Sequence, residues 1–139
     1  MINNILFKAK RLDNKQWIQS NSILQDSFSS DCKLWVNGEG WVKVNEKTLC
    51  RFTCLSDING KNVFEHDIVQ FMDYKIDEFS DEDIEFVNIG KIIFANGQFI
   101  VTNLSLNEMD EMIIGNNCLG AIVIGNCFDN PSLLKDYEN

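Results

Sequence analysis

The single histidine of the chain is the residue whose neighbours best suit catalysis. His66 lies between Glu65 and Asp67, and a carboxylate beside an imidazole can orient it as a general base. Hydrolysis would also need a nucleophile, and spacing does not distinguish the nearby candidates Cys50, Thr53, Cys54 and Ser56. We therefore interpret His66 as a surface or turn histidine, and we predict no catalytic residues and no enzymatic activity.

The five cysteines raise the question of a metal site. They are Cys32, Cys50, Cys54, Cys118 and Cys127, and a zinc site could combine some of them with the histidine. No pair has the C-x₂-C spacing of such sites, and a cysteine outside a disulfide packs as a small hydrophobic residue. We favour structural thiols and predict no metal and no cofactor. An odd number of cysteines without a signal peptide indicates a reducing compartment, which predicts a cytoplasmic location.

Charge and composition bear on the class of partner. The formal net charge is 12 − 21 = −9, whereas binding to nucleic acid through phosphates needs clustered Lys and Arg. The glycine-rich residues 37–40 match neither a P-loop nor a dinucleotide fingerprint, and no apolar run is long enough to span a membrane. We expect neither nucleic acid nor a membrane as partner, since the basic cluster is limited to Lys8, Lys10, Arg11 and Lys15.

Residues 73–85 are the one strongly biased segment. Seven acids against Lys75 give this segment a net charge of −6. It can be a solvated loop or an acidic surface that fits a basic groove on another protein, because aromatic residues alternate with the acids. The missing D-x-D-x-D-G pattern and its glycine argue against a third interpretation, a calcium loop. The candidate partner contacts are Asp73, Tyr74, Asp77, Glu78, Phe79, Asp81, Glu82 and Asp83, together with Trp35 and Trp41 in an earlier hairpin.

Short β-forming segments separated by turns predict the fold. Asn59-Gly60 and Asn96-Gly97 are strong hairpin signals. Short helices are expected at residues 106–112 and 130–135, the second with Asn-Pro at its start. The pattern predicts one domain over residues 1–139, a mainly β, antiparallel, barrel-like (SH3-like) sheet with an acidic loop insert at residues 73–85. The expected strands are residues 5–10, 16–24, 34–36, 41–44, 49–55, 63–72, 87–94, 98–104 and 119–125.

Four blocks of the sequence resemble the YopX-like family of phage and prophage proteins. Residues 44–69 contain V-N-E-K-T and then F-T-C-L-S-D-I-N-G-K-N-V-F-E-H-D-I-V, similar to V-x-x-x-T and Y-T-G-L-x-D-x-N-G-K-x-I-Y-E-G-D-I-V of that family. Residues 7–18, 88–101 and 124–134 are similar to its F-R-A-x-x-x-D-x-x-x-W, G-x-V-x-x-x-x-G-x-F and I-G-N-I-Y-E-N-P-E-L-L blocks. Cys54 and His66 stand where the family commonly has glycine, so a bulkier side chain has to fit at each position, and a positive φ would strain His66.

The resemblance implies a YopX-like, mainly β protein, often oligomeric, in the cytoplasm of a bacterial host. The family has no agreed enzymatic activity, so no catalytic residue is carried over. We predict a non-catalytic accessory protein that binds a host protein and inhibits a defence or nucleic-acid-processing factor. The alternative is a protein that sequesters a nucleotide-like ligand by aromatic stacking, with the phosphates bound by Lys8, Lys10 or Arg51.

Overall fold

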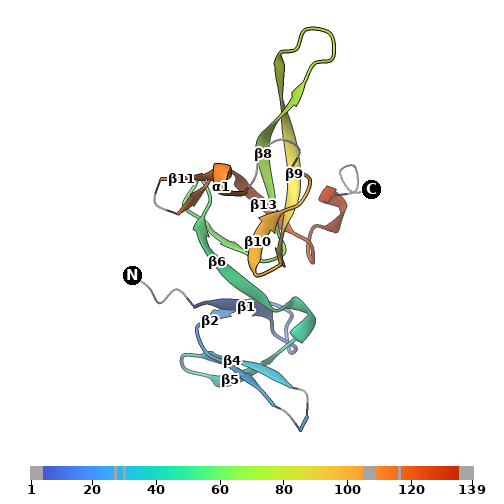
Figure 1. Ribbon diagram of the computed structural model, residues 1–139. Helices are drawn as coiled ribbons and strands as arrows, with labels where there is room; N and C mark the ends of the chain where they lie inside the picture. The colour runs from blue at the N-terminus through green and yellow to red at the C-terminus, as the bar shows by residue number, and fades with distance from the viewer. Residues whose placement is uncertain (1–4, 27, 30, 105–108, 116, 135–139) are drawn as a thin grey trace. The chain divides into compact units, whose positions relative to one another are not determined.

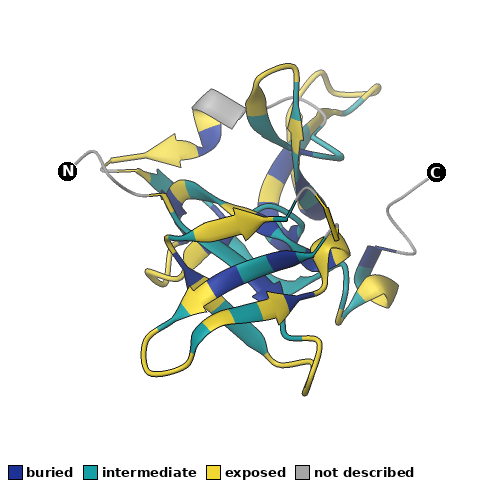
Figure 2. Cartoon of the chain, turned by 90° about the horizontal axis from the view of Figure 1, so that it is seen from below, coloured by how far each residue is buried: buried dark blue, intermediate teal, exposed yellow. Residues whose placement is uncertain are grey.

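The computed structural model describes residues 5–26, 28–29, 31–104, 109–115 and 117–134. The chain forms two compact units, Met1–Phe52 and Thr53–Asn139. Buried residues, dark blue in Figure 2, alternate with more exposed ones along several strands, as expected where one face of a sheet covers a core.

The first unit contains two small antiparallel sheets. Strands β1 (Phe7–Lys10) and β2 (Trp17–Ser20) form a hairpin, and the first residues of β6 (Cys50–Ser56) pair with the other edge of β1. The second sheet has the order β3 (Ile23–Gln25), β4 (Cys32–Val36), β5 (Gly40–Val44). A 3₁₀ turn, η1 (Glu46–Thr48), leads from β5 to β6. The core of this unit consists of Ala9, Cys32, Leu34 and Val44.

A four-stranded antiparallel sheet dominates the second unit. Its order is β10 (Gln98–Val101), β9 (Asp83–Ala95), β8 (Asp67–Ile76), β13 (Ile122–Asn126). The last part of β6 pairs with β7 (Asn62–Phe64) and, in parallel, with β12 (Cys118–Leu119), which pairs with β11 (Ile113–Ile114). The largest core cluster of the unit includes Val63, Val69, Phe71, Ile92, Leu119 and Ala121.

The mainly β prediction is confirmed, but the barrel prediction is wrong. Within the described residues the strands form separate, mainly antiparallel sheets, and no strand joins β10 to β13 to close a barrel. The length of the β8–β9 ladder explains part of the difference between the predicted barrel and the observed sheets. The ladder continues to the pair Ile76–Asp83, well beyond the residues that pair with β13 or β10. The two strands therefore project as a long hairpin (Figure 1).

The predicted helices near the C-terminus are not borne out. Within the described residues, that region contains only single turns, α1 (Met109–Met112) and the 3₁₀ turn η2 (Pro131–Leu134). The β-branched pair Ile113-Ile114 enters strand β11 directly after α1, which ends the helical path. The side-chain oxygen of Asn130, expected to cap a helix, instead accepts from the amide of Asn126. Residues 106–108 of the first predicted helix and residue 135 of the second lie outside the described residues.

Candidate functional site

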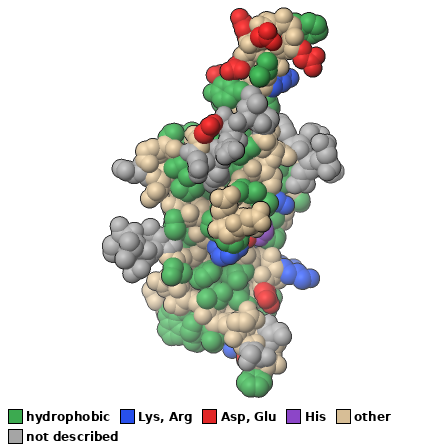
Figure 3. All heavy atoms as spheres, viewed as in Figure 1, with side chains coloured by type: hydrophobic (Ala, Val, Ile, Leu, Met, Phe, Trp, Pro, Cys, Tyr) green, Lys and Arg blue, Asp and Glu red, His purple; other side chains and the backbone are tan. Residues whose placement is uncertain are grey.

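The acidic segment is the end of the β8–β9 hairpin and not a loop insert. Lys75 pairs with Ile84 and Ile76 with Asp83, so only residues 77–82 form the turn. We call residues 76–85 the acidic hairpin end. Figure 3 shows its acidic side chains gathered at the far end of the hairpin. Because a two-stranded ladder supports it, this segment holds its charges in a defined arrangement.

Asp77 organises the turn through its backbone and its carboxylate. The amide of Asp81 donates to the carbonyl of Asp77, and the amide of Asp77 donates to the carbonyl of Glu82. The carboxylate accepts from the Phe79 amide at 3.1 Å and from the Ser80 hydroxyl at 2.9 Å. These hydrogen bonds, first that from Phe79, hold the pKa of Asp77 below its usual value. The turn is therefore ordered around a charged aspartate.

The ordered turn exposes a large aromatic side chain. Phe79 is 97% exposed, and Ile76 on the adjoining strand is 59% exposed. Single exposed apolar residues are common on protein surfaces. Here, however, the aromatic ring stands among exposed carboxylates, which combines an apolar contact with a strong local charge. The acids exposed around it are Glu78, Asp81, Glu82, Asp83 and Glu85.

An aspartate in the first unit accepts the same kind of hydrogen bond from the amide two residues on, and sequence reasoning missed this correspondence. Asp26 accepts from the Phe28 amide at 2.9 Å, and Phe28 is fully exposed. The pKa of Asp26 is lowered by this bond and by a hydrogen bond from Ser29. The signal in the sequence is the repeated Asp-x-Phe-Ser at residues 26–29 and 77–80. The two turns differ in their surroundings, because only the second stands among many acids.

Asp73 does not belong to the exposed partner surface predicted for it. Its side chain is 0% exposed. The side-chain amide of Asn88, on β9, donates to Asp73 at 3.0 Å and also to the carbonyl of Asn103. A run of acids looks uniformly solvated in a sequence, but the pleat turns Asp73 to the opposite face from its neighbour Tyr74. Tyr74 itself is half-buried.

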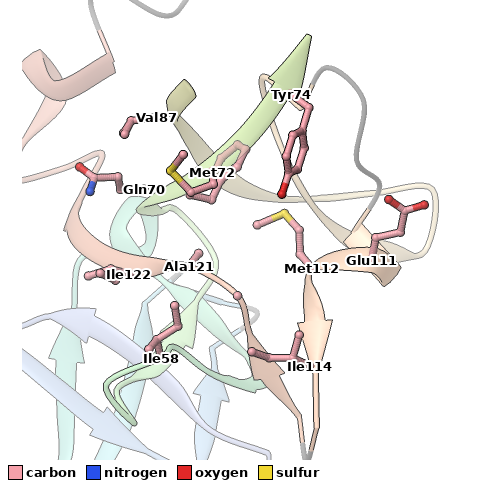
Figure 4. A pocket seen from close by; sticks show the side chains of 12 residues that line it. Ile58, Gln70, Met72, Tyr74, Val87, Glu111, Met112, Ile114, Ala121 and Ile122 are labelled. Atoms are coloured by element: carbon pink, nitrogen blue, oxygen red, sulfur yellow. The ribbon is translucent and has the colours of Figure 1, made fainter. Parts of the chain in front are cut away.

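A pocket of about 410 Å³ lies beside the base of the hairpin, and we call it the base pocket. Figure 4 shows its apolar side chains converging, with Tyr74 directed toward Met112. The sequence signal that could have found one wall is the alternation in β8 that places Gln70, Met72 and Tyr74 on one face. The remaining walls come from distant segments. The lining includes Ile58, Met72, Tyr74, Val87, Met112 and Ile122.

The two tryptophans predicted as partner contacts form a cross-strand pair in the first unit. Trp35 on β4 is in register with Trp41 on β5, and their rings meet edge to face at 5.4 Å. Each is somewhat more than 40% exposed. Such aromatic pairs stabilise antiparallel strands. The pair belongs to a different compact unit from the acidic hairpin end, so one continuous surface cannot be assigned to both.

The three residues proposed for a nucleotide-like ligand do not converge. The ammonium groups of Lys8 and Lys10 lie 4.8 and 5.4 Å from the centre of the Trp17 ring. Arg51 is in register with Phe7, one residue before Lys8. Successive residues of a strand point to opposite faces, so Arg51 leaves the sheet on the face opposite the two lysines. The two lysines and Trp17 form a cation–π cluster on the sheet.

The histidine and its neighbours act as parts of a turn. His66 has φ 74° and Cys54 has φ 68°, so both adopt the conformation that the resemblance assigned to glycine. The His66 ring packs edge to face on Phe128 at 5.4 Å, and its Nε2 lies 3.9 Å from the Glu65 carboxylate. The Thr53 hydroxyl donates to the Val63 carbonyl, and buried Cys50 donates to the Thr48 carbonyl. The Thr53 hydroxyl and the Cys50 thiol are thus engaged in hydrogen bonds that belong to the fold.

The polar residues of the resemblance blocks also hold the fold together. One Asp57 carboxylate oxygen accepts from the amides of Asn59 and Lys61, each at 2.9 Å, and the other from Val123 at 3.0 Å. A Cβ at Gly125 would come within 3 Å of the Asn130 side chain. These blocks therefore specify turns and close contacts. Among the described residues, no group of three or more His, Cys, Asp or Glu could hold a metal ion.

Comparisons with known proteins address the fold and the family of the chain. The solved structure of protein EF1440 from Enterococcus faecalis is similar, with a TM-score of 0.53 and 21% identity over 94% of this chain and 98% of that one. At that identity the similarity shows the fold alone. None of the curated proteins compared with the chain matches it. No helix within the described segments is long and apolar enough to cross a membrane. The family described as YopX protein matches residues 2–135, and the chain therefore belongs to this family.

Proposed function

We propose that this chain is a non-catalytic phage or prophage accessory protein that binds a basic surface of a host protein through the acidic hairpin end. The observation that carries the proposal is the ordered turn that presents Phe79, 97% exposed, among exposed carboxylates. Aromatic side chains are enriched among the residues that contribute most to protein binding. Surrounding charge of one sign accelerates association with an oppositely charged partner.

The class of host protein follows from this charge. Proteins that process nucleic acid carry Lys and Arg surfaces that neutralise phosphates. An acidic hairpin end complements such a surface and would compete with nucleic acid for it. The proposed role is therefore inhibition of a defence or nucleic-acid-processing factor by occupation of its basic groove.

The location of the family blocks supports a division of roles between residues that maintain the fold and residues that contact the partner. Asp57, Gly125 and Asn130 are engaged in turns and close contacts of the second unit. The acidic hairpin end lies outside all the blocks quoted above. We propose that the blocks maintain the fold and that the hairpin end contacts the partner.

The test is comparative affinity capture from a bacterial lysate. The bait is the full chain, either unchanged or carrying Glu78→Lys, Phe79→Ala and Glu82→Lys together. The matched control is Phe28→Ala, which removes an equally exposed phenylalanine of the first unit whose amide donates to an aspartate in the same way. We expect basic proteins that the unchanged chain and the Phe28→Ala control capture, and that the triple variant loses.

Circular dichroism and thermal melting of each bait show whether the fold is retained. All three altered residues of the triple variant are exposed, so we expect its melting curve to stay close to that of the unchanged chain. Capture of the same proteins by the triple variant and the unchanged chain would contradict the proposal.

A further inference from the structure

The base pocket lies on the face of the hairpin that leads to the acidic hairpin end. Along β8, Met72, Tyr74 and Ile76 share one face by alternation. Met72 is in register with Val87, Tyr74 with Glu85 and Ile76 with Asp83. The same face therefore begins with apolar side chains at the pocket and ends with carboxylates.

The charge around the pocket has one sign. Glu111 is among the residues that line the pocket, and no Lys or Arg is among them. Lys75, the single basic residue of residues 73–85, alternates to the other face, where its ammonium lies 5.8 Å from the Phe86 ring. A ligand that complements this face is apolar at one end and cationic along the rest.

The distance between the base pocket and the charges of the acidic hairpin end favours a polypeptide segment over a compact small molecule as the ligand. Met72, which lines the pocket, and Asp77, the first residue of the turn after β8, are five residues apart, which is about 16 Å at the usual rise of an extended chain. A molecule that fills a pocket of about 410 Å³ does not also reach charges at that distance. An extended chain that follows the hairpin covers the same span with about five residues.

We propose that the base pocket receives one large apolar side chain from the partner, within an extended segment whose basic residues begin about five positions from that anchor. This inference rests on the proposed function and defines the partner's chemistry. The anchor fits against Met72, Val87 and Met112, and the basic residues reach Asp83, Glu82 and Glu78. The charge complementarity of the face identifies the occupant as a basic segment.

The experiment uses two synthetic peptides that differ only at the anchor. The first has Trp followed, after four Gly or Ser residues, by Arg-Lys-Arg; the second has Gly in place of Trp. Binding to the full chain is measured by fluorescence anisotropy of an attached dye at low and high salt. We expect the Trp peptide to bind about tenfold or more tightly than the Gly peptide, from burial of the aromatic side chain.

Two double variants and one control distinguish the contribution of the pocket to binding from that of the hairpin end. Met72→Ala with Ile114→Ala reduces the exposed apolar wall, and Leu24→Ala removes a comparably exposed apolar side chain from the first unit. We expect the double variant to abolish the difference between the peptides and Leu24→Ala to preserve it. Glu78→Lys with Glu82→Lys should weaken both peptides and reduce the salt dependence.

The remaining outcomes show which of the two proposals, the base pocket as anchor site or the proposed function, is wrong. Equal binding of the two peptides to the unchanged chain overturns the base pocket as anchor site while leaving the proposed function standing. Binding that is insensitive to the charge reversals contradicts the proposed function instead, and absence of binding by both peptides contradicts both. If sedimentation shows a change of oligomeric state in the pocket double variant alone, the occupant is a second copy of the chain and the inference is wrong.

Discussion

The side-chain amide of Asn88 donates to the buried carboxylate of Asp73 at 3.0 Å, across the β8–β9 ladder. The same amide group also donates to the Asn103 carbonyl, and the Asn103 side chain donates to the Ile89 carbonyl at 3.1 Å. This chain of bonds lies at the base of the hairpin. It joins the projecting strands to the segment after β10 and gives the acidic hairpin end a rigid support.

Loss of the Asn88 amide should destabilise the second unit. In Asn88→Ala, the buried Asp73 carboxylate loses one of its donors, and an incompletely satisfied buried polar group costs about 1–3 kcal/mol of unfolding free energy. Urea denaturation measures the change. Asn62→Ala, at an exposed position of β7, is the matched control and should remain within about 0.5 kcal/mol of the unchanged chain. Equal losses for both variants would contradict a supporting role for this bond.

Local signals predicted the turns well and the long-range arrangement poorly. Gly60 and Gly97 have φ of 81° and 80°, as expected where Asn-Gly connects two strands. Asp73 was misplaced because its burial depends on Asn88, fifteen residues away, which no local pattern connects with it. The barrel prediction failed for a related reason, since closure depends on which distant edges pair.

The base pocket was not predicted because its walls come from segments far apart in the chain. Met72 lies on β8, Met112 on α1 and Ile122 on β13. The alternation of β8 indicates an apolar face, but only the tertiary structure shows that the opposite wall leaves part of this face uncovered. The exposed turn residues Phe79 and Glu82, in contrast, were predicted correctly as surface positions, because charge and turn residues are local properties.

Gly90 should tolerate no side chain. A Cβ there would clash with the Thr102 carbonyl oxygen and would lie 2.8 Å from a Val101 methyl carbon. Gly90→Ala therefore has to move backbone, and we expect a loss of about 1–3 kcal/mol or more. Gly38→Ala meets no atom within 4 Å but has φ 87°, so its cost of about 1–2 kcal/mol comes from strain alone. Chemical denaturation compares the two, and only Gly90→Ala should also shift amide resonances of residues 101 and 102.

Replacement of Cys54 by glycine should slightly increase the stability of the folded chain. Its φ of 68° costs an L-residue about 1–2 kcal/mol, and the greater freedom of glycine in the unfolded chain offsets about 0.4–1 kcal/mol of the relief. We expect Cys54→Gly to be slightly more stable than the unchanged chain. Cys54→Val, which adds a β-branch at the same φ, should be less stable. A stability order in which valine exceeds glycine would show that strain at this position is not what limits stability.

The pH response of the hairpin turn follows from the lowered pKa of Asp77. Hydrogen bonds from the Phe79 amide and the Ser80 hydroxyl favour the carboxylate in the folded chain. Because the folded pKa is below the unfolded value of about 3.9, the stabilisation is fully present above that value. It is lost as the pH falls through the folded pKa. An NMR titration should show the Phe79 amide resonance moving at a pH below about 3.9, together with the Asp77 carboxyl resonance.

Ser80→Ala tests the cause of the shift, because it removes one donor and leaves the Phe79 amide in place. The midpoint for Asp77 should then rise toward its usual value. Ser29→Ala is the matched control: it should raise the midpoint for Asp26, whose carboxylate has the corresponding partners Phe28 and Ser29, without changing Asp77. An Asp77 midpoint unaffected by Ser80→Ala would leave the Phe79 amide as the donor that holds this turn. Neither serine variant should alter peptide binding at neutral pH, where Asp77 is ionised in every variant.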